Sequence, residues 1–368
     1  MVIPSSSTSS SEAALWRRFV SLSLATLVGL AAVSYGFVLL MDPYDSLPFS
    51  LPIDRVQVAD QQRLFYPALA RRDNFDSAVI GNSNIRLLRP DLLNDATGGR
   101  WVNLAINAAS SWEQEQVFNL FLSHHPQPQH ILIGMDYLWC YQRYADRKFV
   151  GATREQDFPA WLFDEVAANN LPPLNLGSIE HSWLLLLHIA GIKTAEFGSN
   201  GYTVFTDPDE EYDVTEARRE IYGSGKPKPI VPVTPPIALT KEQRSALNIP
   251  ALERLQRMLE KLPDSTSTTL MFVPYHSYYQ ARPGSRQAAL WNECKARVSA
   301  IATHRGNTRV LDYMLQTDIT AKDSNYWDYK HYRVSVGNII SREIGSAINA
   351  KPPTGNYKVL VTAKHQHP

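Results

Sequence analysis

Short apolar segments alternate with longer amphipathic segments between residues 73 and 350, and this alternation constrains the fold more than any other feature. About five of the apolar segments have the length of a β-strand, at residues 77–80, 101–106, 131–134, 268–273 and 308–311. Strands that are apolar along their whole length are typical of a parallel sheet with helices on both faces. We therefore predict an α/β fold in three layers, with a doubly wound parallel sheet of about five strands.

Apolar residues with helical spacing follow most of these strands. They predict helices at residues 60–72, 112–122, 246–262, 287–303 and 334–348. Residues 152–240 interrupt the alternation as an insertion, which reads as helical over 152–190 and loses apolar periodicity after residue 198. A connection of this length is typical either of a lid or binding element or of a solvated insertion.

Residues 19–41 contain no charged side chain. As a helix this run would be about 34 Å long, enough to cross the hydrocarbon core of a bilayer. Arg17 and Arg18 precede it, and positive charge stays on the cytoplasmic side of a membrane span. We therefore predict a single-pass anchor in the cell (inner) membrane, with a cytoplasmic N-terminus and a periplasmic main domain. A cleaved signal peptide is the alternative.

These features divide the chain into parts. We expect a disordered cytoplasmic tail at 1–18, a transmembrane helix at 19–41, a linker and helix at 42–72, an α/β domain at 73–350 and a flexible tail at 351–368. The formal net charge of the 368 residues is zero, which argues against a nucleic-acid partner because such proteins usually need a basic surface. Cys140 and Cys294 fit either two buried thiols or one disulfide in an oxidising compartment.

Three residues supply the parts of a nucleophilic hydroxyl site. Ser83 follows the strand at 77–80 through the turn Gly81-Asn82, and a glycine there lets the backbone turn sharply. Asp328 and His331 lie just before the last predicted helix. In such a set the serine attacks, the histidine takes its proton, and the carboxylate holds the imidazole tautomer. The alternative for Ser83 is a helix N-cap, and for the Asp328–His331 pair a place on the surface.

Two further polar residues follow strands. His276 comes after the strand at 268–273 and reads either as a substrate-binding group or second base, or as a loop histidine. Asp136 comes after the strand at 131–134 and would either bind substrate hydroxyls or cap a helix. The histidines are too scattered for a metal site, and there is no phosphate loop or dinucleotide fingerprint, so we expect no metal and no cofactor.

At these positions the chain resembles the SGNH (GDSL-like) hydrolase superfamily, whose fold is a flavodoxin-like doubly wound sheet. Within it, the chain is most similar to the membrane-anchored periplasmic branch that includes alginate O-acetyltransferase-like proteins. The segments at 80–83, 102–110 and 133–136 resemble the first three sequence blocks, residues 272–276 resemble the strand end before the last part of the site, and Asp328 with His331 matches the Asp-x-x-His before the terminal helix. The resemblance implies Ser83 as nucleophile.

The chain departs from the family pattern at the oxyanion site. Asn82 stands where the family has aspartate, Asp136 where it has an asparagine amide, and Asn107 or Ala108 where it has a glycine N–H. A carboxylate opposes an oxyanion unless it is protonated or paired. We expect the oxyanion donors to be Asn84, Asn107 and the backbone N–H of Ser83.

These observations predict a membrane-anchored serine esterase or O-acyltransferase that acts on ester groups, by the resemblance O-acetyl groups, of an envelope or secreted polysaccharide through an acyl-Ser83 intermediate. Acyl transfer would need a membrane-bound partner protein that brings the acyl group across the bilayer. The altered oxyanion elements support an alternative, in which the fold persists as a catalytically inactive polysaccharide-binding or assembly subunit.

Overall fold

A computed structural model describes residues 10–141, 158–164, 170–206 and 208–363. The chain divides into two compact units, one of residues 1–59 with 166–195 and the other of residues 60–165 with 196–368. The predicted insertion at 152–240 is therefore divided between the two units. Its residues 166–195 belong to the unit of the N-terminal helix, and its other residues belong to the unit that contains the sheet. The helical prediction for residues 152–157 and 165–169 lies outside the described residues.

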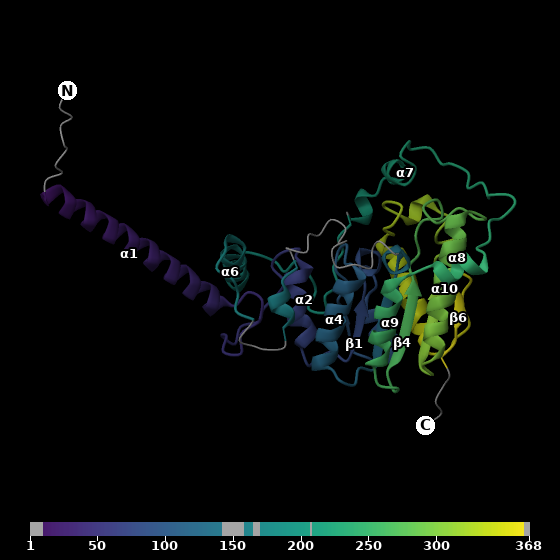
Figure 1. Cartoon of the computed structure of the whole chain (residues 1–368), viewed down its shortest axis with the longest axis horizontal. Coiled ribbons are helices and arrows are strands. Elements are labelled where there is room, and N and C mark those ends of the chain that lie inside the picture. The colour runs from purple at the N-terminus through teal and green to yellow at the C-terminus, as the bar shows by residue number, and fades with distance from the viewer. Residues whose placement is uncertain (1–9, 142–157, 165–169, 207, 364–368) are drawn as a thin grey trace. The chain divides into compact units, whose positions relative to one another are not determined.

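The smaller unit is built on helix α1 (Ser10–Met41) and helix α6 (Leu176–Ile189), which contact each other. Phe37 of α1 lies against Trp183 of α6, with ring centroids 5.1 Å apart. Helix α1 is long and apolar enough to cross a membrane (Figure 1). It begins at Ser10, within the range predicted to be a disordered tail, since Glu12, Ala13 and Ala14 favour helix and extend it beyond the apolar run.

The larger unit contains a six-stranded sheet in the order β2-β1-β3-β4-β5-β6. Its strands are β1 (Ser77–Ile80), β2 (Trp101–Asn103), β3 (His130–Met135), β4 (Ser267–Phe272), β5 (Thr308–Asp312) and β6 (Lys358–Val361). The first five are parallel, as predicted, and follow the 2-1-3-4-5 order of flavodoxin-like doubly wound sheets. The sixth corrects the prediction of about five strands.

Strand β6 comes from residues predicted to be a flexible tail. It pairs antiparallel with β5 at the edge of the sheet. Its side chains are mostly exposed, so main-chain hydrogen bonds rather than a buried apolar face hold it in place. A strand of this kind carries little of the apolar pattern by which buried strands are predicted.

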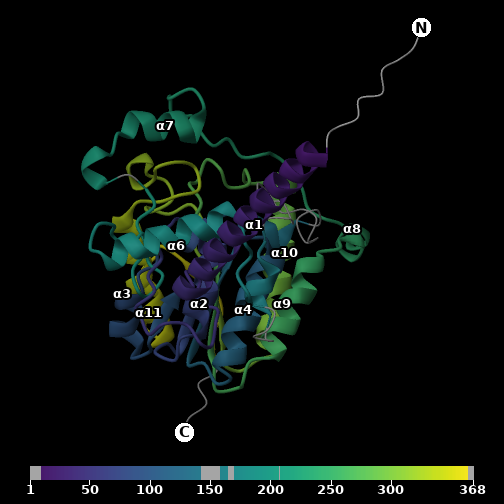
Figure 2. The same ribbon diagram turned by 90° about the vertical axis from the view of Figure 1, so that its left-hand side faces the viewer.

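Helices cover both faces of the sheet, as Figures 1 and 2 show. On one face α3 (Pro90–Thr97) packs against α11 (Val334–Ile348). The other face carries α4 (Ser111–His124), α9 (Pro250–Glu260) and α10 (Arg286–Thr303), in contact in that order, and α2 (Gln62–Arg71) packs on α4. Strands and helices thus form three layers, with one core cluster that extends from β1 to β5.

Short elements outside the layers shape the sheet's carboxyl edge. They are η1 (Ser83–Ile85) after β1, α5 (Tyr137–Cys140) after β3 and η7 (Asp323–Asn325) after β5. The insertion adds η4 (Ala160–Phe163), η6 (Asp209–Glu211) and α7 (Val214–Tyr222), and α8 (Lys241–Ala246) follows it. Cys140 of α5 forms a disulfide with Cys294 of α10, which decides between the two states left open for these cysteines.

Candidate active site

Ser83 lies where the direction of chain connection reverses in the sheet. It follows β1, whose neighbours are β2 and β3, and Asp136 follows β3. In doubly wound sheets, ligands bind beyond the carboxyl ends of the strands at such a reversal. The strand order alone therefore places a site at Ser83.

The turn before Ser83 depends on close packing rather than on an unusual backbone angle. A side chain on Gly81 or on Gly134 of β3 would collide with the side chain of Ile85, which is fully buried beneath the turn. Gly81 is not among the residues with positive φ. Position 81 favours glycine because the side chain of Ile85 lies against the backbone there. The sequence analysis attributed this glycine to a sharp turn of the backbone, and that reason is corrected here.

Ser83, His331 and Asp328 form a continuous hydrogen-bonded chain. The Ser83 Oγ lies 2.9 Å from His331 Nε2, and His331 Nδ1 lies 2.7 Å from Asp328 Oδ2. The side chain of His331 is 22% exposed, so the site is open to a substrate. With the Nδ1 proton held by the carboxylate, Nε2 is the nitrogen that can accept the serine proton.

The loop around Asp328 is closed on itself. Tyr326 and Tyr332 form an isolated antiparallel bridge, and the buried Tyr326 hydroxyl donates to the Pro274 carbonyl at 2.6 Å. The backbone N–H groups of Lys330 and His331 donate to Asp328 Oδ1 at 2.6 and 2.8 Å. Burial by itself would raise the pKa of Asp328, but its hydrogen bonds and the charge of His331 outweigh burial and lower it. The carboxylate is therefore ionised when it orients the imidazole.

Asn82 and Asp136, singled out above as unlike the SGNH pattern, contact each other. The Asn82 side-chain amide donates to Asp136 Oδ2, and the other Asp136 oxygen accepts from the Leu138 N–H at 2.9 Å as the N-cap of α5. Asp136 is fully buried. Burial raises its pKa to about 7, although the two hydrogen bonds act in the opposite sense. Asp136 therefore caps a helix and supports Asn82, the residue before Ser83.

The expected oxyanion donors differ in how far they are already engaged. The Asn84 amide donates to Asn82 Oδ1 at 2.8 Å, and Asn107 Oδ1 accepts from Arg86 at 2.8 Å. The Ser83 N–H donates to no other group in the described part of the chain. Ala108 has φ of 52°, the left-handed conformation that a glycine adopts without strain. The Ser83 N–H is therefore ready to bind an oxyanion, and the Asn107 amide nitrogen likewise donates to no other described group, because only its oxygen is engaged by Arg86.

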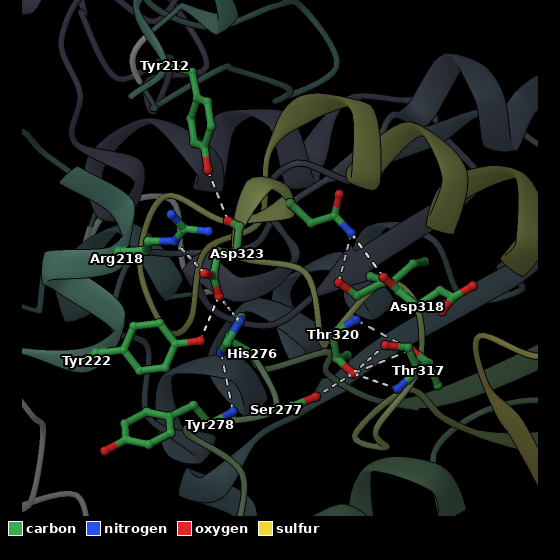
Figure 3. A network of polar contacts seen from close by, with 12 residues as sticks. Tyr212, Arg218, Tyr222, His276, Ser277, Tyr278, Thr317, Asp318, Thr320 and Asp323 are labelled. Carbon is green, nitrogen blue, oxygen red and sulfur yellow. Dashed lines mark hydrogen bonds and ion pairs between the residues drawn. The ribbon is translucent and has the colours of Figure 1, made fainter. Parts of the chain in front are cut away.

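The structure does not bring His276 to Ser83. Its Nε2 lies 3.3 Å from Asp323 Oδ1, and its Nδ1 accepts from the Tyr278 N–H at 3.2 Å. Asp323 also accepts hydrogen bonds from Arg218 and Tyr222 of α7, each at 2.7 Å (Figure 3). Burial lowers the pKa of His276, although the Asp323 carboxylate acts in the opposite sense. In this network His276 links the strand end after β4 to α7.

Sequence reasoning missed four residues that shape the site. Phe205 of the insertion lies edge-on to the His331 ring, with centroids 5.5 Å apart, and the Arg86 guanidinium lies 4.6 Å from the Phe205 centroid. The Asn103 amide donates to three carbonyl groups between Ile85 and Leu88, which fixes the turn after Ser83. Lys330 precedes His331 directly. Asn103 carried a signal, because it lies in the segment that resembles the second block, whereas Phe205 carried none.

Comparison with models of known protein families and with curated protein sequences gives no match.

Proposed function

We propose that this protein is a membrane-anchored, extracytoplasmic serine enzyme of ester chemistry, an esterase or O-acyltransferase of the SGNH type that acts on an acylated polysaccharide. The observation that carries the proposal is the hydrogen-bonded chain from Ser83 through His331 to Asp328. Its distances and order are those in which a serine hydroxyl is activated by a neighbouring base. The resemblance of the surrounding segments supports an ester substrate, such as an O-acetyl group.

In the first half-reaction the Ser83 Oγ attacks the carbonyl carbon of the ester while His331 Nε2 takes its proton. The carbonyl oxygen becomes an oxyanion, which the Ser83 N–H is placed to stabilise. The tetrahedral intermediate then breaks the bond to the alcohol oxygen, and the alcohol leaves with the proton from His331. The product is an acyl-Ser83 ester.

In the second half-reaction a hydroxyl group attacks the acyl-Ser83 carbonyl, and His331 takes the proton of that hydroxyl. The Ser83 oxygen leaves and recovers the proton from His331, so the enzyme returns to its starting state. Water as the attacking group makes the protein an esterase, and a sugar hydroxyl makes it a transferase. A transferase would receive its acyl group through a membrane-bound partner protein.

Two features support a location of the sheet domain outside the cytoplasm. Helix α1 is long and apolar enough to cross a membrane, and Arg17 and Arg18 precede its uncharged run. The disulfide between Cys140 and Cys294 belongs to an oxidising compartment, because cytoplasmic thiols are kept reduced. Both features agree with an N-terminus in the cytoplasm and a main domain in the periplasm.

The test uses the full-length protein in detergent micelles with p-nitrophenyl acetate and a serine-reactive phosphonate probe. We expect Ser83 to be labelled, and turnover to fall at least about 1,000-fold in Ser83→Ala and His331→Ala. Addition of an oligosaccharide acceptor separates transfer from hydrolysis by the product formed. A folded protein that is neither labelled nor active would remove the proposal.

A non-catalytic role is the second candidate, and Asp136 is the observation that favours it. This buried carboxyl stands where the family has an asparagine amide, so one oxyanion donor of the family is missing. A missing donor typically costs on the order of 100- to 1,000-fold in rate. In a strain that lacks the protein, full rescue by Ser83→Ala would support an assembly or polysaccharide-binding subunit.

A further inference from the structure

Helix α6 exposes apolar side chains and covers polar ones. Its buried side chains are Ser178, His181, Ser182 and Leu185. Leu176 and Trp183 are 86% and 54% exposed. A surface helix of a domain in water has the opposite arrangement, with its apolar stripe toward the core. Large exposed apolar patches mark sites of interaction with a membrane or with another protein.

The part of the chain around α6 carries more of these side chains. More than half of the large apolar side chains that are exposed outside α1 belong to the smaller unit, although it contains far fewer described residues than the larger one. Besides Leu176 and Trp183 they are Phe49, Leu51, Leu171, Leu174, Ile189 and Ile192. Glu180 is the only acidic residue of α6, which contains no lysine or arginine. The outer side of α6 is therefore a mostly apolar surface.

The polar side of α6 is occupied within the same unit. The hydroxyl of Tyr44, in the segment after α1, lies 2.9 Å from His181 Nδ1 and 3.4 Å from Ser178 Oγ. Ser182 Oγ donates to the Ser178 carbonyl at 2.8 Å. These contacts fix which side of α6 faces the protein, so the apolar side is left to an outside partner.

Helix α1 indicates that this partner is the lipid bilayer. Trp183 lies against Phe37 of α1. Phe37 lies four residues before the end of the uncharged run at 19–41, which is about 6 Å along the helix. When α1 crosses a bilayer, this contact places Trp183 at the boundary between lipid and water, where tryptophan side chains are enriched.

The length and direction of α6 are those of a helix that lies on a membrane. Its 14 residues span about 21 Å, too short to cross a hydrocarbon core of about 30 Å. In Figures 1 and 2 it lies across the C-terminal end of α1 rather than along it. A helix across the end of a membrane-spanning helix runs parallel to the membrane plane, as interfacial helices do.

We propose that α6 is an interfacial helix, with Leu176, Trp183 and Leu187 among lipid acyl chains. This inference rests on the membrane anchor in the function proposed above, and it adds a second lipid contact to that anchor. Interfacial helices are often rich in lysine and arginine and then depend on anionic lipids. Because α6 has neither residue, burial of its apolar side chains holds it in place, and neutral lipids are sufficient. Helices α1 and α6 together fix the depth of the smaller unit at the membrane surface.

The test measures the depth of single nitroxide labels on the full-length protein in vesicles of phosphatidylcholine. The chain's only two cysteines are bonded to each other, so each label takes one introduced thiol. Leu176→Cys and Leu187→Cys lie three turns apart on the outer side of α6. Gln256→Cys, at an exposed position on α9, is the matched control, and Leu27→Cys, inside the uncharged run of α1, reports on the anchor itself.

The measured quantity is the ratio of two collision rates of the label, one with oxygen, which dissolves in lipid, and one with a nickel chelate, which stays in water. We expect this ratio to be several-fold higher at both positions of α6 than at Gln256, and highest at Leu27. Addition of phosphatidylglycerol to the vesicles should leave the ratios at α6 unchanged. Circular dichroism on each labelled variant checks that it is folded.

Ratios at Leu176 and Leu187 equal to the ratio at Gln256 would overturn the inference, as would ratios that rise only with phosphatidylglycerol. Labels that are shielded from nickel in native membranes but not in pure lipid would assign the surface to a membrane protein instead of the bilayer. The label at Leu27 separates this inference from the anchor on which it rests. Lipid contact at Leu27 with water at α6 removes only the interfacial helix, and water at Leu27 removes the anchor of the proposed function as well.

Discussion

The larger unit contains two histidine–aspartate pairs at the same edge of the sheet, and they differ in what surrounds them. In the pair of His331 and Asp328, the second nitrogen of the histidine lies 2.9 Å from a serine hydroxyl, Ser83 Oγ. In the pair of His276 and Asp323, the second nitrogen of the histidine accepts from a backbone N–H. Only the first pair leaves its histidine free to take a proton from another side chain.

The carboxylates differ in the same way. Among the described residues, Asp328 accepts only from its own loop, from His331 and two backbone N–H groups. Asp323 accepts from α7 through Arg218 and Tyr222, and its backbone carbonyl accepts from the Tyr212 hydroxyl (Figure 3). Burial would raise the pKa of Asp323, but the hydrogen bonds from Arg218 and Tyr222 outweigh it and lower the pKa. Asp328 therefore orients the ring of His331. Asp323, five residues earlier in the same loop, instead attaches helix α7 of the insertion to that loop.

The largest expected difference between the pairs lies in turnover. Asp328→Asn should lower kcat for p-nitrophenyl acetate about 10,000-fold, because an amide in place of the carboxylate favours the wrong tautomer of His331. Asp323→Asn keeps the shape of the second pair and should lower kcat less than about tenfold. Steady-state kinetics on both variants, with folding checked by circular dichroism, make the measurement. Equal losses in the two variants would contradict the division of roles.

Asp136 is a third carboxyl near the site, and its effect should appear as a pH dependence of stability. Its pKa is raised from 3.8 to about 7. The folded protein therefore binds a proton that the unfolded chain releases, so the stabilisation is complete below about pH 4 and is lost as the pH rises to about 7. A shift of this size corresponds to at most about 4 kcal/mol.

The measurement is the slope of unfolding free energy against pH between 4 and 7 in urea titrations. Asp136→Asn should flatten the slope, whatever its stability at a single pH. Asp95→Asn, at an exposed carboxylate, is the control and should leave the slope as in the wild type. An unchanged slope in Asp136→Asn would show that Asp136 is ionised throughout this range.

Periodicity predicted the buried parts of the fold well. Helix α11 and strand β1 have the predicted bounds. The sequence also predicted five apolar residues on one face of the helix at 246–262, and all five are buried: Leu252, Leu255, Met258, Leu259 and Leu262. Helix α7 was not predicted, although its buried Ala217, Ile221 and Tyr222 have helical spacing, because a helix of nine residues carries only a short pattern. Arg218 and Tyr222 also bond to Asp323, about 100 positions away, and a contact of that kind leaves no pattern in the sequence.

The candidate site shows the same limit. The spacing of Asp328 and His331 along the chain predicts their contact, and the position of Ser83 follows from its place after a strand. Local sequence was therefore enough to pick out the three residues that the fold joins by hydrogen bonds. The hydrogen bond between Asn82 and Asp136 joins residues 54 positions apart, and only the fold brings them together. The sequence left His276 open between a substrate-binding group or second base and a loop histidine, because its partner, Asp323, could not be identified from the sequence.

A smaller effect is expected at the link between Asp323 and α7. Tyr222→Phe removes a 2.7 Å hydrogen bond to a carboxylate from a side chain that is mostly buried. Hydrogen bonds to charged groups contribute about 1.5–3 kcal/mol, so the free energy of unfolding should fall by about that amount. Tyr278→Phe is the matched control, because its hydroxyl bonds to no other group in the described ranges. If both variants unfold alike, the link to α7 contributes no stability.

The smallest effect is expected for His276→Gln. Its Nε2 lies 3.3 Å from Asp323 but has no well-aligned hydrogen-bond partner among the described residues, and burial lowers its pKa, so the neutral ring should contribute less than the roughly 1 kcal/mol of an ordinary hydrogen bond. A lowered histidine pKa gives stability that is present above about pH 6.5 and is lost as the pH falls, because the folded state resists the proton that the unfolded chain binds. His276→Gln should therefore be slightly less stable at pH 7 and should lose less stability between pH 7 and pH 5. Its turnover per labelled Ser83 should match the wild type, whereas a loss as large as that of His331→Ala would make His276 a second base and merge the two pairs into one site.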